Sequence, residues 1–215
     1  HAIDRALIIE KVLENTATIV NGILSPDSFG YSDLPAYDYD PELAKKLLAE
    51  AGYADGVDAV LDVQGPFKDL AEVIAQQLTD VGIRTTVQVW ENAVITPLWN
   101  DPAKRERDMY LSSWGNAGLD PNGIFLPTLH TNDRGNYSGY SNATVDELLL
   151  AAQYETDVAK REEMYHQAEA QVNKDAPLIF LWVPQDIYGV SKRVTNFQPL
   201  PSQMIYLHRV GIASQ

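Results

Sequence analysis

The sequence contains no cysteine, which excludes a disulfide framework, a thiolate nucleophile and a zinc–thiolate site. It also lacks an apolar run of the roughly 20 residues that a membrane-spanning helix needs, and no signal peptide is recognisable. Basic residues are scarce, because 16 Lys and Arg stand against 30 Asp and Glu, for a formal net charge of −14. That balance argues against nucleic acid and anionic membranes as partners.

Patterns for metal binding, cofactor binding and nucleophilic catalysis are missing as well. The four histidines are scattered, with no HExxH motif and no pair four residues apart. Asp38 and Asp40 do not begin a calcium-binding loop, because Leu43 stands in place of the required glycine and Ala49 in place of the bidentate glutamate. No GxGxxG or Walker loop occurs, and Ser138 lacks the first glycine of a nucleophile elbow. The sequence therefore predicts no metal site, no cofactor and no catalytic residue.

The length and composition fit a globular domain. With 45% hydrophobic residues among 215, the chain can bury a substantial core, in one large or two small domains. Residues 1–5 begin a helical pattern without an N-terminal cap. We therefore expect the sequence to be a piece of a longer chain.

Hydrophobic periodicity predicts an α/β arrangement in the middle of the chain. Residues 57–63 alternate as a half-buried strand, residues 67–81 carry a helical stripe, and residues 83–90 alternate again. Strand, crossover helix and strand of these lengths form a βαβ unit, so the two strands should be parallel. The other expected helices cover residues 2–13, 41–51, 93–99, 145–154 and 157–174, and the other expected strands cover residues 109–113 and 176–183.

Some of these elements carry specific expectations about burial. The continuous apolar run at residues 176–183 should be a strand that is buried on both faces. Residues 187–215 contain only short extended pieces, too few for a core of their own, and should pack on another part of the protein. Four side chains of the first helix should share its buried face: Ile3, Leu7, Ile8 and Val12.

The stretch from residue 108 to residue 140 joins the expected third strand to a wide, glycine-rich turn. Trp114 follows the strand, and Gly115, Gly118 and Gly123 come after it. Loops at the carboxyl ends of strands hold ligands in α/β proteins, and an aromatic face among free backbone groups suits a small polar ligand. The alternative interpretation is that Trp114 caps a core and that the glycines only let the chain turn.

Two charged residues of this stretch also have two interpretations each. Arg134 could grip a carboxylate or phosphate group of a ligand, or could form a surface salt bridge. Asp120 could bind a ligand ammonium group, or could cap a turn at residues 122–124, and capping is favoured.

Six blocks of the sequence, in the same order, resemble the C-terminal half of the family 5 extracellular solute-binding proteins. These proteins are the receptors of ABC importers for peptides, nickel and related solutes. The second block is the most specific. The blocks read AIDRALIIEKVL, YDYDPELAKKLLAEAGYADG, QQLTDVGIRTTVQ, SSWGNAGLDP, NYSGYSNATVDELLLAA and KREEMYHQAEAQVNKDAPLIFLW.

The resemblance implies an α/β fold, a type II periplasmic-binding-protein-like lobe with a mixed sheet flanked by helices and with the βαβ unit. Residues 1–186 would form the C-terminal ligand-binding lobe. Residues 187–215 would be an arm that returns to a missing N-terminal lobe, and the export signal would precede that lobe.

The resemblance also implies a binding function in which no covalent bond is made or broken, so the protein would not be an enzyme. It would bind a peptide or peptide-like ligand between two lobes and deliver it to an ABC permease. It would do so in the periplasm or at the cell surface of a bacterium, without inserting into the membrane itself. Alternatives within the class are receptors for glutathione, an opine, an oligosaccharide or a nickel chelate. Alternatives from other functional classes are a hydrolase with an acidic pair near Trp114 and a purely structural or interaction domain.

The resemblance finally implies where the ligand binds. Trp114 matches the cleft tryptophan of the peptide and nickel receptors. Ala117 stands where the dipeptide and oligopeptide receptors place the aspartate that anchors the ligand's α-ammonium group, and Asp120 could take over that role. Asn136 and Tyr137 match the NYS segment of the dipeptide receptors. The expected ligand-binding residues are Trp114, Asn116, Ala117, Gly118, Asp120, Arg134, Asn136, Tyr137 and Tyr140.

Overall fold

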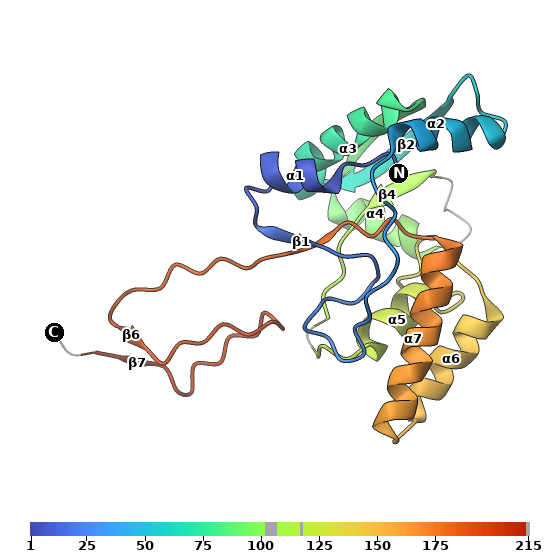
Figure 1. The fold of residues 1–215 in the computed structure, drawn as a ribbon. Coiled ribbons are helices and arrows are strands. Elements are labelled where there is room, and N and C mark those ends of the chain that lie inside the picture. The colour runs from blue at the N-terminus through green and yellow to red at the C-terminus, as the bar shows by residue number, and fades with distance from the viewer. Residues whose placement is uncertain (102–106, 117, 214–215) are drawn as a thin grey trace.

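A parallel three-stranded sheet in the order β3-β2-β4 lies at the centre of one half of the molecule (Figure 1). The structure, a computed structural model, describes residues 1–101, 107–116 and 118–213. β2 (Val57–Gln64) pairs over its whole length with β3 (Ile83–Trp90), and its residues 61–63 pair with β4 (Met109–Leu111). The βαβ unit predicted from periodicity is thus confirmed.

Helices cover both faces of this sheet. α3 (Lys68–Asp80) follows the 3-10 turn η1 (Gly65–Phe67) and packs with α1 (Arg5–Lys11) on one face. Successive strand residues point to opposite faces, and α4 (Asn92–Asn100) lies on the other face, where Ile95 is buried. The first core consists of Ile3, Ile8, Leu61, Val63, Ala71, Ile74 and Leu78.

The helix expected at residues 41–51 is present as α2 (Pro41–Glu50), which lies near α3 at the top of Figure 1. Asp40 caps it, since its side chain accepts a hydrogen bond from the backbone N–H of Leu43. Pro41 occupies the first helical position, where a missing N–H costs nothing.

The other half of the molecule is helical. α5 (Asn122–Leu129), α6 (Ala143–Tyr154) and α7 (Val158–Asp175) pack together below the sheet in Figure 1. Asn142 and Asp157 cap α6 and α7, because their side chains accept hydrogen bonds from the first backbone N–H groups. The second core consists of Leu24, Ile124, Phe125, Leu129, Val145, Leu149, Ala152, Tyr165, Ala168 and Val172.

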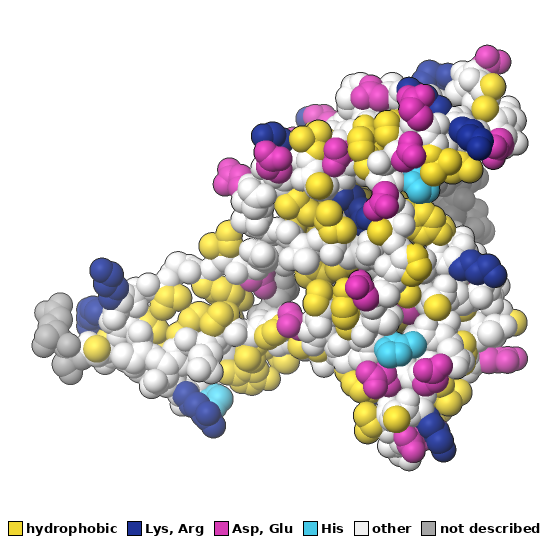
Figure 2. Space-filling view, in the orientation of Figure 1, with side chains coloured by type: hydrophobic (Ala, Val, Ile, Leu, Met, Phe, Trp, Pro, Cys, Tyr) yellow, Lys and Arg dark blue, Asp and Glu magenta, His cyan; other side chains and the backbone are white. Residues whose placement is uncertain are grey.

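The end of the chain leaves the body as an extended arm (Figure 1). β1 (Ala17–Ile19) pairs antiparallel with β5 (Trp182–Pro184), and beyond it β6 (Val194–Thr195) pairs with β7 (Gly211–Ile212). Yellow apolar side chains are visible along the arm in Figure 2. The most exposed of them are Ile187, Ile205, Leu207 and Ile212. No helix in the described part of the chain is long and apolar enough to cross a bilayer.

The expected strand at residues 176–183 is wrong in its extent and its burial. Only its last two residues belong to β5, and Ile179 is 62% exposed. Ala176 ends α7 in the left-handed conformation (φ 48°), and Pro177 follows it without an N–H for a strand ladder. Since β5 pairs only with β1, it lies in a two-stranded sheet and not inside a larger one.

Two further expectations need correction. α1 is shorter than expected because Asp4 caps it, and Leu7 and Val12 are 45% and 39% exposed, whereas Ile9 is buried. Residues 122–129 form the helix α5 where a turn was expected. Gly123 and Pro127 count against a helix in the sequence, but five of the eight residues of α5 are buried, and this packing outweighs the low propensity.

Candidate functional site

The carboxyl ends of all three parallel strands meet at one edge of the central sheet. From β2 the chain passes through α3 to β3 on one side, and from β3 it passes through α4 to β4 on the other side. Ligands of α/β proteins bind in the crevice at such a reversal of strand order. The site predicted around Trp114 lies here, because Trp114 follows the carboxyl end of β4.

Trp114 is held in place by two features of the sequence. Pro127 has no N–H, so the carbonyl of Gly123, four residues earlier in α5, has no helical donor. The indole Nε1–H of Trp114 donates to that carbonyl at 3.2 Å. Gly135 packs against the ring, since a Cβ at that position would lie 2.6 Å from a ring carbon. The guanidinium carbon of Arg134 lies 5.3 Å from the centre of the Trp114 ring.

The turn after Trp114 is closed by its own polar groups. The side-chain amide of Asn116 donates to the carbonyl of Asp120 at 3.0 Å. The backbone N–H of Leu119, which is left-handed at φ 50°, donates to the carbonyl of Asn116 at 3.1 Å. Gly118 lies exposed in this turn, and Ala117 lies outside the described residues.

Asp120 forms an ion pair with a side chain of α7. Both of its carboxylate oxygens accept from the guanidinium group of Arg161, at 2.7 Å and 2.8 Å, and one also accepts from the backbone N–H of Asn122 at 2.9 Å. The hydrogen bonds from Arg161 lower the pKa of this carboxyl group below its ordinary value. The bond to Asn122 agrees with the capping interpretation, and a ligand ammonium group would have to share the carboxylate with Arg161.

The 130–140 loop is built around a buried amide. Asn136 is fully buried, and its Nδ2 donates to the carbonyls of His130 (3.0 Å) and Tyr140 (2.7 Å), while its Oδ1 accepts from Ser138 and the Tyr140 backbone. The Tyr140 hydroxyl donates to Asp175 in α7 at 2.6 Å. Burial and this carboxylate raise the Tyr140 pKa. Asn136 and Tyr140 thus shape the loop and attach it to α7.

Tyr137 turns the other way, toward the sheet. Its ring centre lies 5.4 Å from those of Trp99 and Tyr110, and these two lie 5.1 Å from each other. Asp62 lines the same small space as the three rings. It is a fully buried residue of β2, and its Oδ1 accepts from the Trp90 indole at 2.8 Å. Sequence analysis missed Asp62, because an acid in an alternating strand reads as part of the solvent face.

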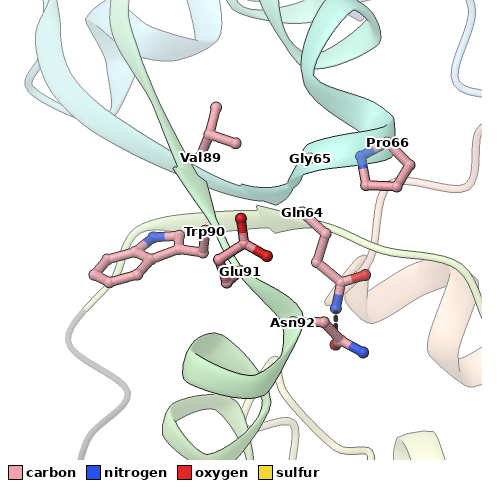
Figure 3. Close-up of a pocket in the computed structure, with 7 residues that line it drawn as sticks. All are labelled: Gln64, Gly65, Pro66, Val89, Trp90, Glu91 and Asn92. Atoms are coloured by element: carbon pink, nitrogen blue, oxygen red, sulfur yellow. Dashed lines mark hydrogen bonds between the residues drawn. The ribbon is translucent and has the colours of Figure 1, made fainter.

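Trp90, whose indole donates to Asp62, also lines a pocket of about 340 Å³ (Figure 3). It lies at the carboxyl ends of β2 and β3, and the side-chain amide of Gln64 donates to Asn92 at its floor (2.7 Å). No group of three His, Cys, Asp or Glu side chains that could hold a metal ion occurs among the described residues. The pocket is lined by Gln64, Gly65, Pro66, Val89, Trp90, Glu91 and Asn92.

Comparison with known proteins assigns the chain to a family. Residues 1–136 match the family model described as bacterial extracellular solute-binding proteins, family 5, middle. The chain belongs to this family. The resemblance noted from the sequence is therefore confirmed, and so is the α/β lobe that it implied.

Relatives in the solute-binding family match almost the whole chain. The heme-binding protein A of Haemophilus influenzae is 31% identical over 198 residues, which cover 86% of this chain and 34% of that protein. A dipeptide-binding protein of Escherichia coli is 28% identical over 227 residues, which cover 99% and 41%. The structure of DppA from Helicobacter pylori in complex with the peptide STSA has a TM-score of 0.79 and 28% identity over 86% of this chain and 37% of that one. The chain thus spans less than half of these relatives.

Proposed function

We propose that the chain is the ligand-binding lobe of an extracytoplasmic receptor of an ABC importer, which binds a peptide or peptide-like ligand. The observation that carries the proposal is the position of Trp114. It is half-buried, fixed by Gly123 and Gly135, and stands at the carboxyl edge of the sheet. Family membership and the peptide-binding relatives support the same ligand class.

The polar groups at this edge suit a small polar ligand. An aromatic ring buries the apolar part of such a ligand, and a guanidinium group grips its carboxylate with two parallel hydrogen bonds. Trp114 and Arg134 supply these two groups next to each other. Binding of this kind makes and breaks no covalent bond, and we propose that the protein is not an enzyme.

The proposal includes a second lobe that the chain does not contain. A hinge motion that closes two lobes over one ligand is stabilised by the contacts that both lobes make to it. We assign residues 1–186 to the ligand-binding lobe and residues 187–215 to an arm that packs on the second lobe. The exposed apolar side chains of the arm support this assignment, because they have no core of their own. The closed receptor would deliver its ligand to a membrane permease from the periplasm or the cell surface.

Calorimetric titration of the full-length protein tests the proposal. The panel comprises pools of di- to pentapeptides, glutathione, heme, an opine, oligosaccharides and nickel chelates. We expect the peptide pools to bind, and Trp114→Ala to lose more than about 1 kcal/mol of binding free energy, the typical effect of a buried aromatic contact.

The control is Tyr154→Ala, which removes an aromatic side chain that is 80% exposed on α6. It should bind the peptide pools as the wild type does. Heat from another ligand and none from peptides would overturn the ligand class. Equal affinities for the wild type and Trp114→Ala would remove Trp114 from the site.

A further inference from the structure

A buried carboxylate in the central strand has an unused hydrogen-bonding oxygen. Asp62 is 0% exposed, and the Trp90 indole donates to its Oδ1 at 2.8 Å. No donor in the described part of the chain hydrogen-bonds to its Oδ2. The Nε atom of Arg107 lies 3.5 Å from that oxygen, which is an ion-pair contact without a hydrogen bond. Since a buried charge is costly unless it is both paired and hydrogen-bonded, Oδ2 has the capacity for a stronger partner.

The surroundings of this oxygen suit a cation. Faces of aromatic rings attract positive charge, and Trp99, Tyr110 and Tyr137 line the same space as the carboxylate. The space between them is about 40 Å³, more than the volume that a single water requires. It is lined by Asp62, Ile95, Leu98, Trp99, Arg107, Tyr110 and Tyr137.

Arg107 indicates how a cation would enter. Its side chain is 44% exposed, and its guanidinium carbon lies 5.6 Å from the centre of the Trp90 ring. The guanidinium group therefore stands at the mouth of the space, stacked on an aromatic face and only loosely paired with Asp62. A half-exposed side chain held by a long ion-pair contact and one ring contact can give way to a cation that pairs better with Asp62, and its departure enlarges the space.

We propose that Asp62 and the rings of Trp99, Tyr110 and Tyr137 form a subsite for a cationic group of the ligand, an ammonium or a guanidinium, which displaces Arg107. This inference rests on the proposed function, and it names a chemical feature of the ligand. The subsite and the Trp114 site share one loop, because Tyr137, which lines the subsite, is two residues after Gly135, against which the Trp114 ring packs. A ligand with both a cationic and an anionic group would match the carboxylate of Asp62 and the guanidinium of Arg134.

The first test compares peptides that differ only in charge. Citrulline has nearly the shape of arginine but is neutral, so we titrate the full-length protein with arginine-containing peptide pools and with the same pools containing citrulline. We expect the wild type to bind the arginine pools about tenfold more tightly, because a hydrogen bond between two charged groups is stronger than one to a neutral group. Asp62→Asn keeps an acceptor for Trp90 and should remove this preference. A preference that is unchanged in Asp62→Asn would overturn the proposal.

The second test removes the competing side chain. Arg107→Met should tighten the binding of the arginine pools and leave the citrulline pools unchanged. Lys68→Met is the control, since it removes an exposed cation on α3 that pairs with Glu72 at 3.5 Å. Weaker binding of arginine pools by Arg107→Met would show that Arg107 itself contacts the ligand, and would overturn the displacement.

The third test separates this inference from the peptide function. Agmatine carries a guanidinium and an ammonium group without a peptide, and the indole N–H signal of Trp90 in an NMR spectrum reports on Asp62. Agmatine should shift that signal in the wild type and not in Asp62→Asn. If neither peptide pool binds and agmatine still shifts the signal, the peptide function fails and the cation subsite stands. If Asp62→Asn does not fold, the same agmatine titration of the wild type and of Arg107→Met tests the subsite. If agmatine shifts the Trp90 indole signal in neither protein, the subsite is overturned.

Discussion

Gly135→Ala should displace Trp114, because the added methyl group has no space. The Cβ would lie 2.6 Å and 2.7 Å from two ring carbons of Trp114 and 2.9 Å from the carbonyl oxygen of Pro127. The ring could rotate away, but the Pro127 carbonyl is fixed by the hydrogen bond that it accepts from the Gly135 backbone at 2.8 Å. Overpacking of this kind costs about 1–3 kcal/mol.

Two assays on the full-length protein measure the effect of Gly135→Ala. In urea unfolding, we expect the transition of this lobe to move to lower denaturant by the equivalent of about 1–3 kcal/mol. In calorimetric titration with the peptide pools, we expect about fivefold weaker binding or more, because the aromatic contact shifts.

The matched control is Gly115→Ala, which changes a glycine next to Trp114 with nothing within 4 Å of the new Cβ. It should leave the unfolding transition unchanged. A Gly135→Ala variant as stable and as tightly binding as the wild type would refute the packing argument for Trp114.

Two further substitutions test the polar contacts around the site. Asp120→Asn should destabilise the protein by about 1 kcal/mol at neutral pH, a value reduced because the Asp120 side chain is 45% exposed. Arg161 lowers the folded-state pKa of Asp120, so this stabilisation is complete above the unfolded pKa of about 3.9 and is lost as pH falls through the lower folded value. Unfolding measured against pH should therefore show the variant and the wild type converging below about pH 4, and a constant difference would contradict the ion pair. Tyr140→Phe should cost about 1 kcal/mol by losing the bond to Asp175, with peptide affinity unchanged in titration. A large loss of affinity would instead make Tyr140 a ligand contact.

The sequence predicted the elements whose packing follows one periodicity. β2, α3 and β3 each carry apolar residues at a regular spacing in the sequence, so alternation and helical stripes located them to within about two residues. Asp40, Asn142 and Asp157 cap the next helices through their own side chains, and such caps depend on local sequence alone.

The elements that sequence analysis missed depend on distant contacts. α5 contains Gly123 and Pro127, and it is helical because Phe125 and Leu129 are fully buried in the second core. The end of the apolar run at residues 176–183 pairs with β1, which lies more than 150 positions earlier in the chain. No local sequence pattern predicts this pairing.

The position of Trp114 after a strand was predictable, and the contacts of the residues around it were not. A tryptophan after a strand indicated the carboxyl edge of the sheet. The pairing of Asp120 with Arg161 joins residues 41 positions apart, and Asp62 meets Trp90 across 28 positions. Asn136 matched a family motif, but its buried side-chain amide donates hydrogen bonds to two carbonyl groups of its own loop. Tertiary packing brings such partners together, so their spacing in the sequence does not predict the contacts.

Hydrogen–deuterium exchange on the full-length protein tests the central claim most directly, because it locates the ligand without changing a residue. With a peptide pool that binds in titration, we expect protection of the amides in residues 112–116 and 133–137, on either side of the Trp114 ring. Residues 187–215 should be protected with and without peptide, since the arm packs on the second lobe. Protection elsewhere, with none in these two loops, would contradict the assignment of the ligand site to Trp114.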